Sequence, residues 1–262
     1  MMYQALLITL AALPVVIILF LVYFRDKNKE PMVLLIKLFL SGFVSVGLVL
    51  ILNELLSKFL PFMQNSLAEK TIVELLLYTF LGVALVEESS KWIMTYIFGY
   101  KNKEFDELYD ALLYAVFVSL GFAFLENIWY VIRDSSVNSA LMRAVSAVPG
   151  HTCFAISMGY NLSMAKFYNF KKDSCKERKY LILSIVIPTI LHGIYDFCLM
   201  SQFQILMTVF SIFIIILYVY SIMRVAKLSK TNKKIKFKNK FCKTCGKVVT
   251  GEFCSRCGTR QE

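Results

Sequence analysis

Seven long apolar stretches dominate this chain of 262 residues and restrict it to folds that cross a membrane. An α-helix needs about 20 apolar residues to cross the hydrocarbon core of a bilayer. Of all residues, 58% are hydrophobic and the mean hydropathy is +0.62, which a soluble domain of this size does not show. The stretches lie near residues 2–24, 32–52, 71–98, 109–132, 144–165, 180–200 and 203–223. We therefore predict an all-α polytopic membrane bundle of about seven spanning helices.

Positive charge is distributed unevenly between the loops that connect these stretches. Loops 25–30, 99–108 and 166–179 and the tail 224–262 carry 23 of the 29 Lys and Arg residues, and the alternate loops carry four. Because cytoplasmic loops are enriched in Lys and Arg, we predict a cell-membrane protein with its N-terminus outside and its C-terminus in the cytoplasm. The first stretch lacks the basic start and the cleavage site of a signal peptide, so we expect a retained helix. The basic residues can also contact the lipid bilayer. No nucleic-acid-binding pattern accompanies them, and we expect no nucleic acid partner.

The last part of the chain has the cysteine pattern of a small zinc ribbon. A Lys-rich linker, residues 224–241, leads to two Cys-x-x-Cys-Gly knuckles within residues 242–262. The four cysteines are Cys242, Cys245, Cys254 and Cys257. Four thiolates suit one structural Zn²⁺, and the metal would supply most of the folding free energy of so small a module. Two disulfides are the alternative, which a reducing cytoplasm disfavours. We also expect the ribbon to offer a site for a further cytoplasmic partner.

Acidic and basic side chains occur deep inside the third and fourth apolar stretches, where each costs at least about 2.5–3.5 kcal/mol. The third contains Glu87, Glu88 and Lys91, and Lys91 lies at the helical spacing that pairs it with either carboxylate. Two carboxylates so close cannot both ionise cheaply, so one of them is a candidate general base. The fourth stretch contains Glu126. A salt-bridged helix end and, for Glu126, a lone buried acid bonded to a neighbour are the alternatives.

Both histidines of the chain lie in apolar stretches. His151 follows Pro149 and Gly150, which we expect to disrupt the helix beside the imidazole. His192 and Asp196 are four residues apart, so the carboxylate can orient the imidazole or join it as a ligand. A core-packed His151 and an isolated structural His192–Asp196 pair are the alternatives. Since polar motifs on four separate segments are each costly, we predict that they share one polar site.

Four blocks of the chain resemble the PrsW family of intramembrane proteases, which is related to the CAAX-protease and bacteriocin-processing superfamily. The blocks are EESSKW (87–92), FDELYD (105–110), SLGFAFLEN (119–127) and HGIYDF (192–197). By this resemblance the glutamate pair of the family corresponds to Glu87 and Glu88, and its essential histidine to His192. Its other polar motif positions fall on Glu126, His151 and Asp196. The resemblance implies a protease core over 1–223 that cleaves a membrane-anchored protein, such as an anti-sigma factor, on its extracytoplasmic side.

The residues leave two forms of peptide hydrolysis open. In the first, His192, His151 and a carboxylate hold a second Zn²⁺ while Glu87 or Glu88 takes a proton from water. In the second, a Glu activates water without metal and the histidines stabilise the oxyanion. The chain has no His-Glu-x-x-His motif, although the family carries the label metalloprotease.

A different class of function is also open. Intramembrane Glu, His and Asp form proton or cation pathways in transporters, and an inactive relative of the proteases would bind membrane segments without cutting them. The sequence shows no internal repeat of the kind that many transporters carry.

Overall fold

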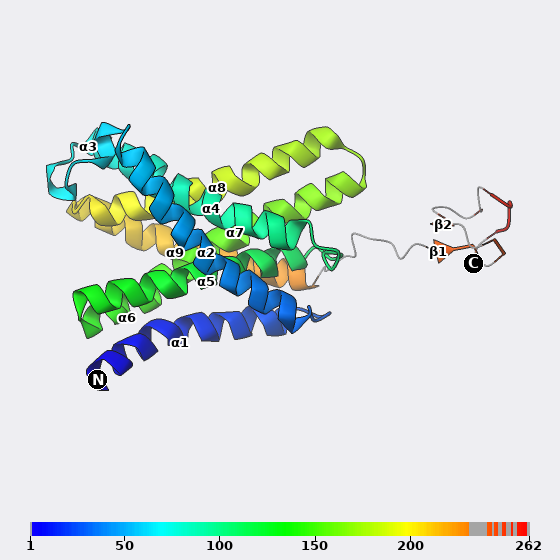
Figure 1. The fold of residues 1–262 in the computed structure, drawn as a ribbon, viewed down its shortest axis with the longest axis horizontal. Helices are drawn as coiled ribbons and strands as arrows, with labels where there is room; N and C mark the ends of the chain where they lie inside the picture. Colours follow the sequence, from blue (N-terminus) through cyan, green and yellow to red (C-terminus); the bar gives the residue numbers. More distant parts are fainter. Residues whose placement is uncertain are drawn as a thin grey trace.

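Long helices form the membrane part of the molecule. A computed structural model describes residues 2–230 and, in the tail, residues 240–242, 244–245, 248–249, 253 and 256–260. The long helices are α1 (Met2–Arg25), α2 (Met32–Ser57), α5 (Asp110–Asp134), α7 (Ala147–Phe170), α8 (Ser174–Met200) and α9 (Gln204–Lys230). They cross one another in one bundle, in which α2 runs diagonally over α5 (Figure 1). The other helices enclose most of α5, whereas α1 and α9 expose most of their surface. The predicted all-α multi-pass membrane bundle is confirmed.

All seven predicted apolar stretches are helical, but they differ in character. Within the described residues, α1, α2, α5, α8 and α9 are long and apolar enough to cross a membrane. The stretch 71–98 consists of shorter helices that follow one another without a loop. They are α3 (Ile72–Leu77), the π-helical η3 (Tyr78–Ala84), α4 (Leu85–Met94) and the π-helical η4 (Thr95–Tyr100). Such π-helical turns are rare and are frequent at functional sites. The two π-helical segments flank α4, which carries Glu87 and Glu88.

Short helices occupy two of the predicted loops. The segment after α2 contains the 3₁₀ helices η1 (Pro61–Met63) and η2 (Leu67–Glu69), and the predicted loop 133–143 contains most of α6 (Val137–Val145). Ser136 is the N-cap residue of α6, and its hydroxyl accepts a hydrogen bond from the backbone N–H of Ser139. Helix α6 lies along α1 (Figure 1).

Two expectations about helix limits were wrong. Helix α7 begins at Ala147, so Pro149 lies in its first turn and the helix continues unbroken through His151. The backbone N–H that proline lacks has no intrahelical partner at that position, so proline is tolerated there. Helix α9 continues to Lys230 and so includes residues 224–230 of the predicted linker. Lys227 and Lys230 lie in its last turn, where cations interact favourably with the helix dipole.

Glycines allow α2 and α5 to approach each other closely. An added Cβ on Gly42 of α2 would lie only 2.6 Å from the backbone nitrogen of Phe122 on α5 and would overlap the carbonyl oxygen of Val118. An added Cβ on Gly121 of α5 would overlap the carbonyl oxygen of Phe39. Small residues at such crossings are what packing in a membrane requires, because helices there gain stability from close contact.

The described part of the tail has the form of a small two-stranded module. Strands β1 (Lys240–Phe241) and β2 (Val248–Val249) pair antiparallel, and Phe253 forms a bridge with Arg260. The sulfur atoms of Cys242, Cys245 and Cys257 lie within 4.8 Å of one another, and these three cysteines form no disulfide. Cys254 lies outside the described residues. Three thiols clustered in this way suit a metal site better than a pair of disulfides.

Candidate active site

The seven ionisable residues that we predicted to meet do lie together. Helix α4 supplies Glu87, Glu88 and Lys91, α5 supplies Glu126, α7 supplies His151, and α8 supplies His192 and Asp196. All are buried except Glu126, which is partly exposed. One ligand atom from each of Glu87, Glu88, His151 and His192 lies within 4.8 Å of the other three. Three helical segments, α4, α7 and α8, therefore bring two carboxylates and two imidazoles to one point, and Glu126 of α5 lies beside His151.

Lys91 holds the two carboxylates of its own helix. Its Nζ lies 3.0 Å from Glu87 Oε2 and 2.9 Å from Glu88 Oε1, as the i+4 and i+3 spacing predicts. The same Nζ lies 3.3 Å from His151 Nδ1 and 4.0 Å from the ring centroid of Phe122. An ammonium in such a buried position needs anionic partners, so Lys91 and the glutamates stabilise one another's charge.

His192 connects Glu88 to Asp196. Its Nδ1 lies 3.0 Å from Glu88 Oε1 and its Nε2 lies 3.3 Å from Asp196 Oδ2. The ring of Phe154 stacks on the imidazole at a centroid distance of 4.8 Å. Partners on both ring nitrogens and a stacked ring leave this imidazole little freedom to rotate. The second oxygen of Glu88, Oε2, is buried and has no hydrogen-bond partner among the described residues.

His151 belongs to a second chain of contacts. Its Nε2 lies 2.8 Å from Glu126 Oε2, and Arg143 donates from Nη2 to the same oxygen at 3.0 Å. Arg143 also donates from Nε to Asn127 Oδ1 at 2.8 Å. Its guanidinium lies 4.0 Å from the ring centroid of Tyr130. Glu126 is therefore fixed from two sides, and it can hold the His151 imidazole in one orientation.

Arg143 is a site residue that sequence reasoning missed. The sequence predicts a loop charge at this position, within 133–143, whereas Arg143 projects from α6 toward the carboxylate of Glu126. The available signal was the helix pattern after Ser136, because a helix there brings residue 143 to a defined position rather than to solvent.

A cavity of about 450 Å³ opens beside these residues. Its charged and imidazole lining consists of Glu87, Glu126, Arg143, His151, His192 and Asp196. Glu87 lines this cavity, but Glu88 does not, and Glu88 is fully buried. Tyr78, Tyr130 and Tyr195 also line the cavity and add phenol groups. The cavity thus presents one carboxylate of the α4 pair and both imidazoles to whatever enters it.

Comparison with known proteins agrees with this geometry. Residues 30–223 match the model of a family described as PrsW family intramembrane metalloprotease. The chain belongs to the PrsW family. It is therefore a membrane-embedded protease, and its substrate is a protein in the membrane. No solved structure matches the chain.

Individual relatives support the same assignment. The chain is 35% identical over 238 residues to Protease PrsW of Clostridioides difficile (strain 630), covering 89% of this chain and 95% of the relative. It is 35% identical to Protease PrsW of Oceanobacillus iheyensis, covering 80% of this chain and 92% of the relative. It is 36% identical to Protease PrsW of Bacillus subtilis (strain 168), covering 68% of this chain and 75% of the relative.

Proposed function

We propose that this PrsW family protease hydrolyses a peptide bond in the cavity beside Glu87. The catalytic groups are Glu87, Glu88, His151 and His192, and Glu126, Asp196 and Lys91 support them. The observation that carries this proposal is the convergence of polar groups from four helical segments on one cavity within a membrane bundle. Each of these groups is expensive in lipid, and the cost is relieved when they face one another and water.

The two glutamates of α4 have different roles in this proposal. Glu87 lines the cavity, so its carboxylate can take a proton from a water molecule that attacks the substrate carbonyl. Glu88 is enclosed by Lys91 and His192 and does not line the cavity, so it takes part in catalysis through the groups that it holds and not by contact with substrate. His192 also lines the cavity, where its imidazole can stabilise the developing oxyanion, and Glu88 and Asp196 hold its orientation.

The donor set at this site suits a zinc ion. Two imidazoles and two carboxylates are ligands that Zn²⁺ accepts, and Glu88 Oε2 is a buried oxygen without a partner among the described residues. His151, His192 and Glu88 would hold the ion. When bound, Zn²⁺ would polarise the scissile carbonyl and lower the pKa of a bound water. Glu126 and Asp196 would then keep the two imidazoles in the orientation that binding requires.

The domain limits, the topology and the partners also form part of the proposal. The protease core ends near residue 223, although its last helix continues to Lys230, and the tail is a separate zinc ribbon in the cytoplasm. The N-terminus lies outside, as the 23-to-4 distribution of Lys and Arg indicates. An anti-sigma factor anchored in the same membrane is a suitable substrate, and the ribbon binds a cytoplasmic partner.

Cleavage by purified protein tests the catalytic assignment. Wild type should cut a single-span protein, whereas Glu87→Gln and His192→Ala should lose about 10²–10⁴-fold in rate at normal protein level. Glu54→Gln is the matched control, because that carboxylate lies on α2 with 73% of its side chain exposed. Wild-type rates in both site variants would refute the assignment. A proton-coupled flux lost in both variants, with no cleavage by any form of the protein, would favour a transporter.

Accessibility labelling tests the topology. The tail cysteines should react with an impermeant thiol reagent only after the cells are opened and the metal is removed. Labelling in intact cells would reverse the proposed orientation.

A further inference from the structure

A groove between α2 and α5 leads from the lipid-facing surface to the active-site cavity. It measures about 740 Å³. Its apolar walls include Val46, Val49 and Leu50 on α2 and Leu125, Ile128 and Trp129 on α5. Asn53, Glu87, Glu126 and Tyr130 line both this groove and the site cavity. The two spaces therefore adjoin each other at the carboxylates.

The mouth of the groove opens where lipid surrounds the protein. Leu50 is 66% exposed and Trp129 is 71% exposed, and both belong to helices apolar enough to span a membrane. Both residues lie in the C-terminal halves of their helices. In the proposed topology these halves face the outer leaflet, which is the side on which the resemblance implies cleavage.

Asn53 marks the inner end of the groove. Its amide oxygen Oδ1 is buried and has no hydrogen-bond partner among the described residues. A buried carbonyl without a partner costs free energy, which a donor from an incoming molecule would recover. The backbone N–H groups of a transmembrane helix are already bonded within that helix. A substrate can therefore bond to Asn53 through its backbone only where its helix has unwound, and an unwound chain is also what a peptidase needs to reach the scissile carbonyl.

We propose that this groove admits the substrate as an unwound, apolar stretch of a membrane-anchored protein, with Asn53 accepting a hydrogen bond from its backbone. This inference rests on the proposed proteolytic function. The apolar walls bind the side chains, and the end of the groove at Glu87 and Glu126 receives the peptide group to be cut.

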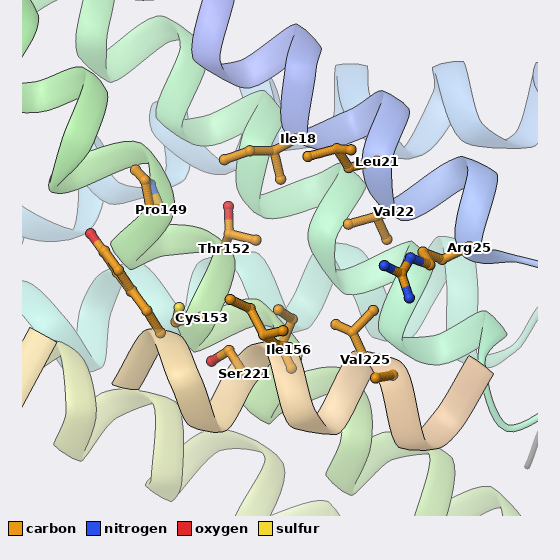
Figure 2. A pocket seen from close by; sticks show the side chains of 13 residues that line it. Ile18, Leu21, Val22, Arg25, Pro149, Thr152, Cys153, Ile156, Ser221 and Val225 are labelled. Carbon is orange, nitrogen blue, oxygen red and sulfur yellow. The ribbon is translucent and has the colours of Figure 1, made fainter. Parts of the chain in front are cut away.

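A second apolar pocket lies away from the site. It measures about 430 Å³ and lies between α1, α7 and α9. Figure 2 shows Thr152, Cys153 and Ile156 of α7 along this pocket. None of the catalytic carboxylates or imidazoles described above lines it. A substrate in this pocket would still have to pass α7, so the groove between α2 and α5 is the direct route.

Site-specific photocross-linking tests the route. A photoreactive amino acid is placed at Leu50 or Trp129 in the Glu87→Gln background, which retains uncut substrate. Val44 is the matched control on α2, because it is 59% exposed and lines none of the cavities described above. Ile222 reports on the pocket of Figure 2, where it is 68% exposed. Adducts should form at positions 50 and 129 at several times the yield at 44 and 222. Equal yields at position 44, or adducts at position 222 alone, would refute the proposed route.

Blocking the groove gives a second readout. Leu50→Trp should slow cleavage of a membrane-anchored substrate at least about tenfold, while Val44→Trp should leave it unchanged. A short water-soluble peptide that reaches the cavity directly should be cut equally by both variants. Asn53→Ala should raise KM for the membrane substrate more than it lowers kcat, because its bond is made on binding. If wild-type protein cleaves neither substrate, the proposed proteolytic function itself is refuted. If wild-type protein cleaves normally and neither Leu50→Trp nor Asn53→Ala changes cleavage, the proposed substrate route through the groove is refuted and the proteolytic function is not.

Discussion

Replacing one glycine should separate the two helices that form the groove. In Gly42→Ala the new methyl group would meet backbone atoms of α5, among them the nitrogen of Phe122 at 2.6 Å. Backbone atoms cannot rotate away, so α2 and α5 must move apart. Overpacking of this kind costs about 1–3 kcal/mol, against a gain of about 1 kcal/mol in helix propensity when alanine replaces glycine. We expect a net loss of about 1–2 kcal/mol, since backbone contacts place the cost near the top of its range.

Gly47→Ala supplies the control on the same helix. Nothing lies within 4 Å of a Cβ built at Gly47, so this variant should be neutral or slightly stabilised. Unfolding in mixed micelles with increasing SDS measures both variants, and cleavage of a membrane substrate follows the site. Gly42→Ala should also lose activity, because Phe122 lies against Lys91 and Glu126 lies one turn further along α5. Equal stability and activity in the two variants would show that this close crossing does not hold the site together.

Three further changes test separate parts of the molecule. Arg143→Gln should lower the rate of cleavage about 10- to 100-fold, because the hydrogen bond that fixes Glu126 is lost. Arg143→Lys should restore only part of the activity, because an ammonium lacks the guanidinium fork. Wild-type activity in Arg143→Gln would refute this role. Burial raises the pKa of Glu30, between α1 and α2, from near 4.5 to about 7. The folded state therefore holds this proton more tightly than the unfolded chain, and stability falls as the pH rises from about 5 to about 8. Measured as Tm, this fall should be smaller in Glu30→Gln, and an identical fall in both proteins would contradict it. Cys242→Ser should lower the zinc content measured by metal analysis by about one ion per chain and leave cleavage by the membrane core at least partly intact. Cys175→Ser should change neither the zinc content nor cleavage. An unchanged zinc content in Cys242→Ser would refute the ribbon site.

The predicted site followed from an energetic argument that needs no structure. Glu87, Glu126, His151 and His192 lie on different segments, and each is costly in lipid, so a shared site was the least expensive arrangement. The helical spacing also predicted that Lys91 would pair with the α4 carboxylates, because these contacts lie within one helix.

Contacts that depend on how the helices cross could not be predicted. Arg143 had the sequence appearance of a loop charge, and only the presence of α6 and its approach to α5 gives it a partner. The groove depends on the separation of α2 from α5, which Gly42 and Gly121 set through tertiary contact. The π-helical segments beside α4 likewise depend on packing, and no residue pattern in 71–98 predicts them.

The charge balance of the site separates the two forms of hydrolysis. Four carboxylates, those of Glu87, Glu88, Glu126 and Asp196, face the two cations Lys91 and Arg143, which leaves a formal charge of −2 when both histidines are neutral. Buried charge must be compensated, and one divalent ion would compensate this excess, whereas a metal-free site needs two bound protons. We expect the divalent ion. Full-length protein with all four tail cysteines changed to serine should therefore retain about one zinc per chain, and a further Glu88→Gln change should weaken its retention. Full activity of this four-serine variant after metal removal would show instead that bound protons compensate the negative charge of the site.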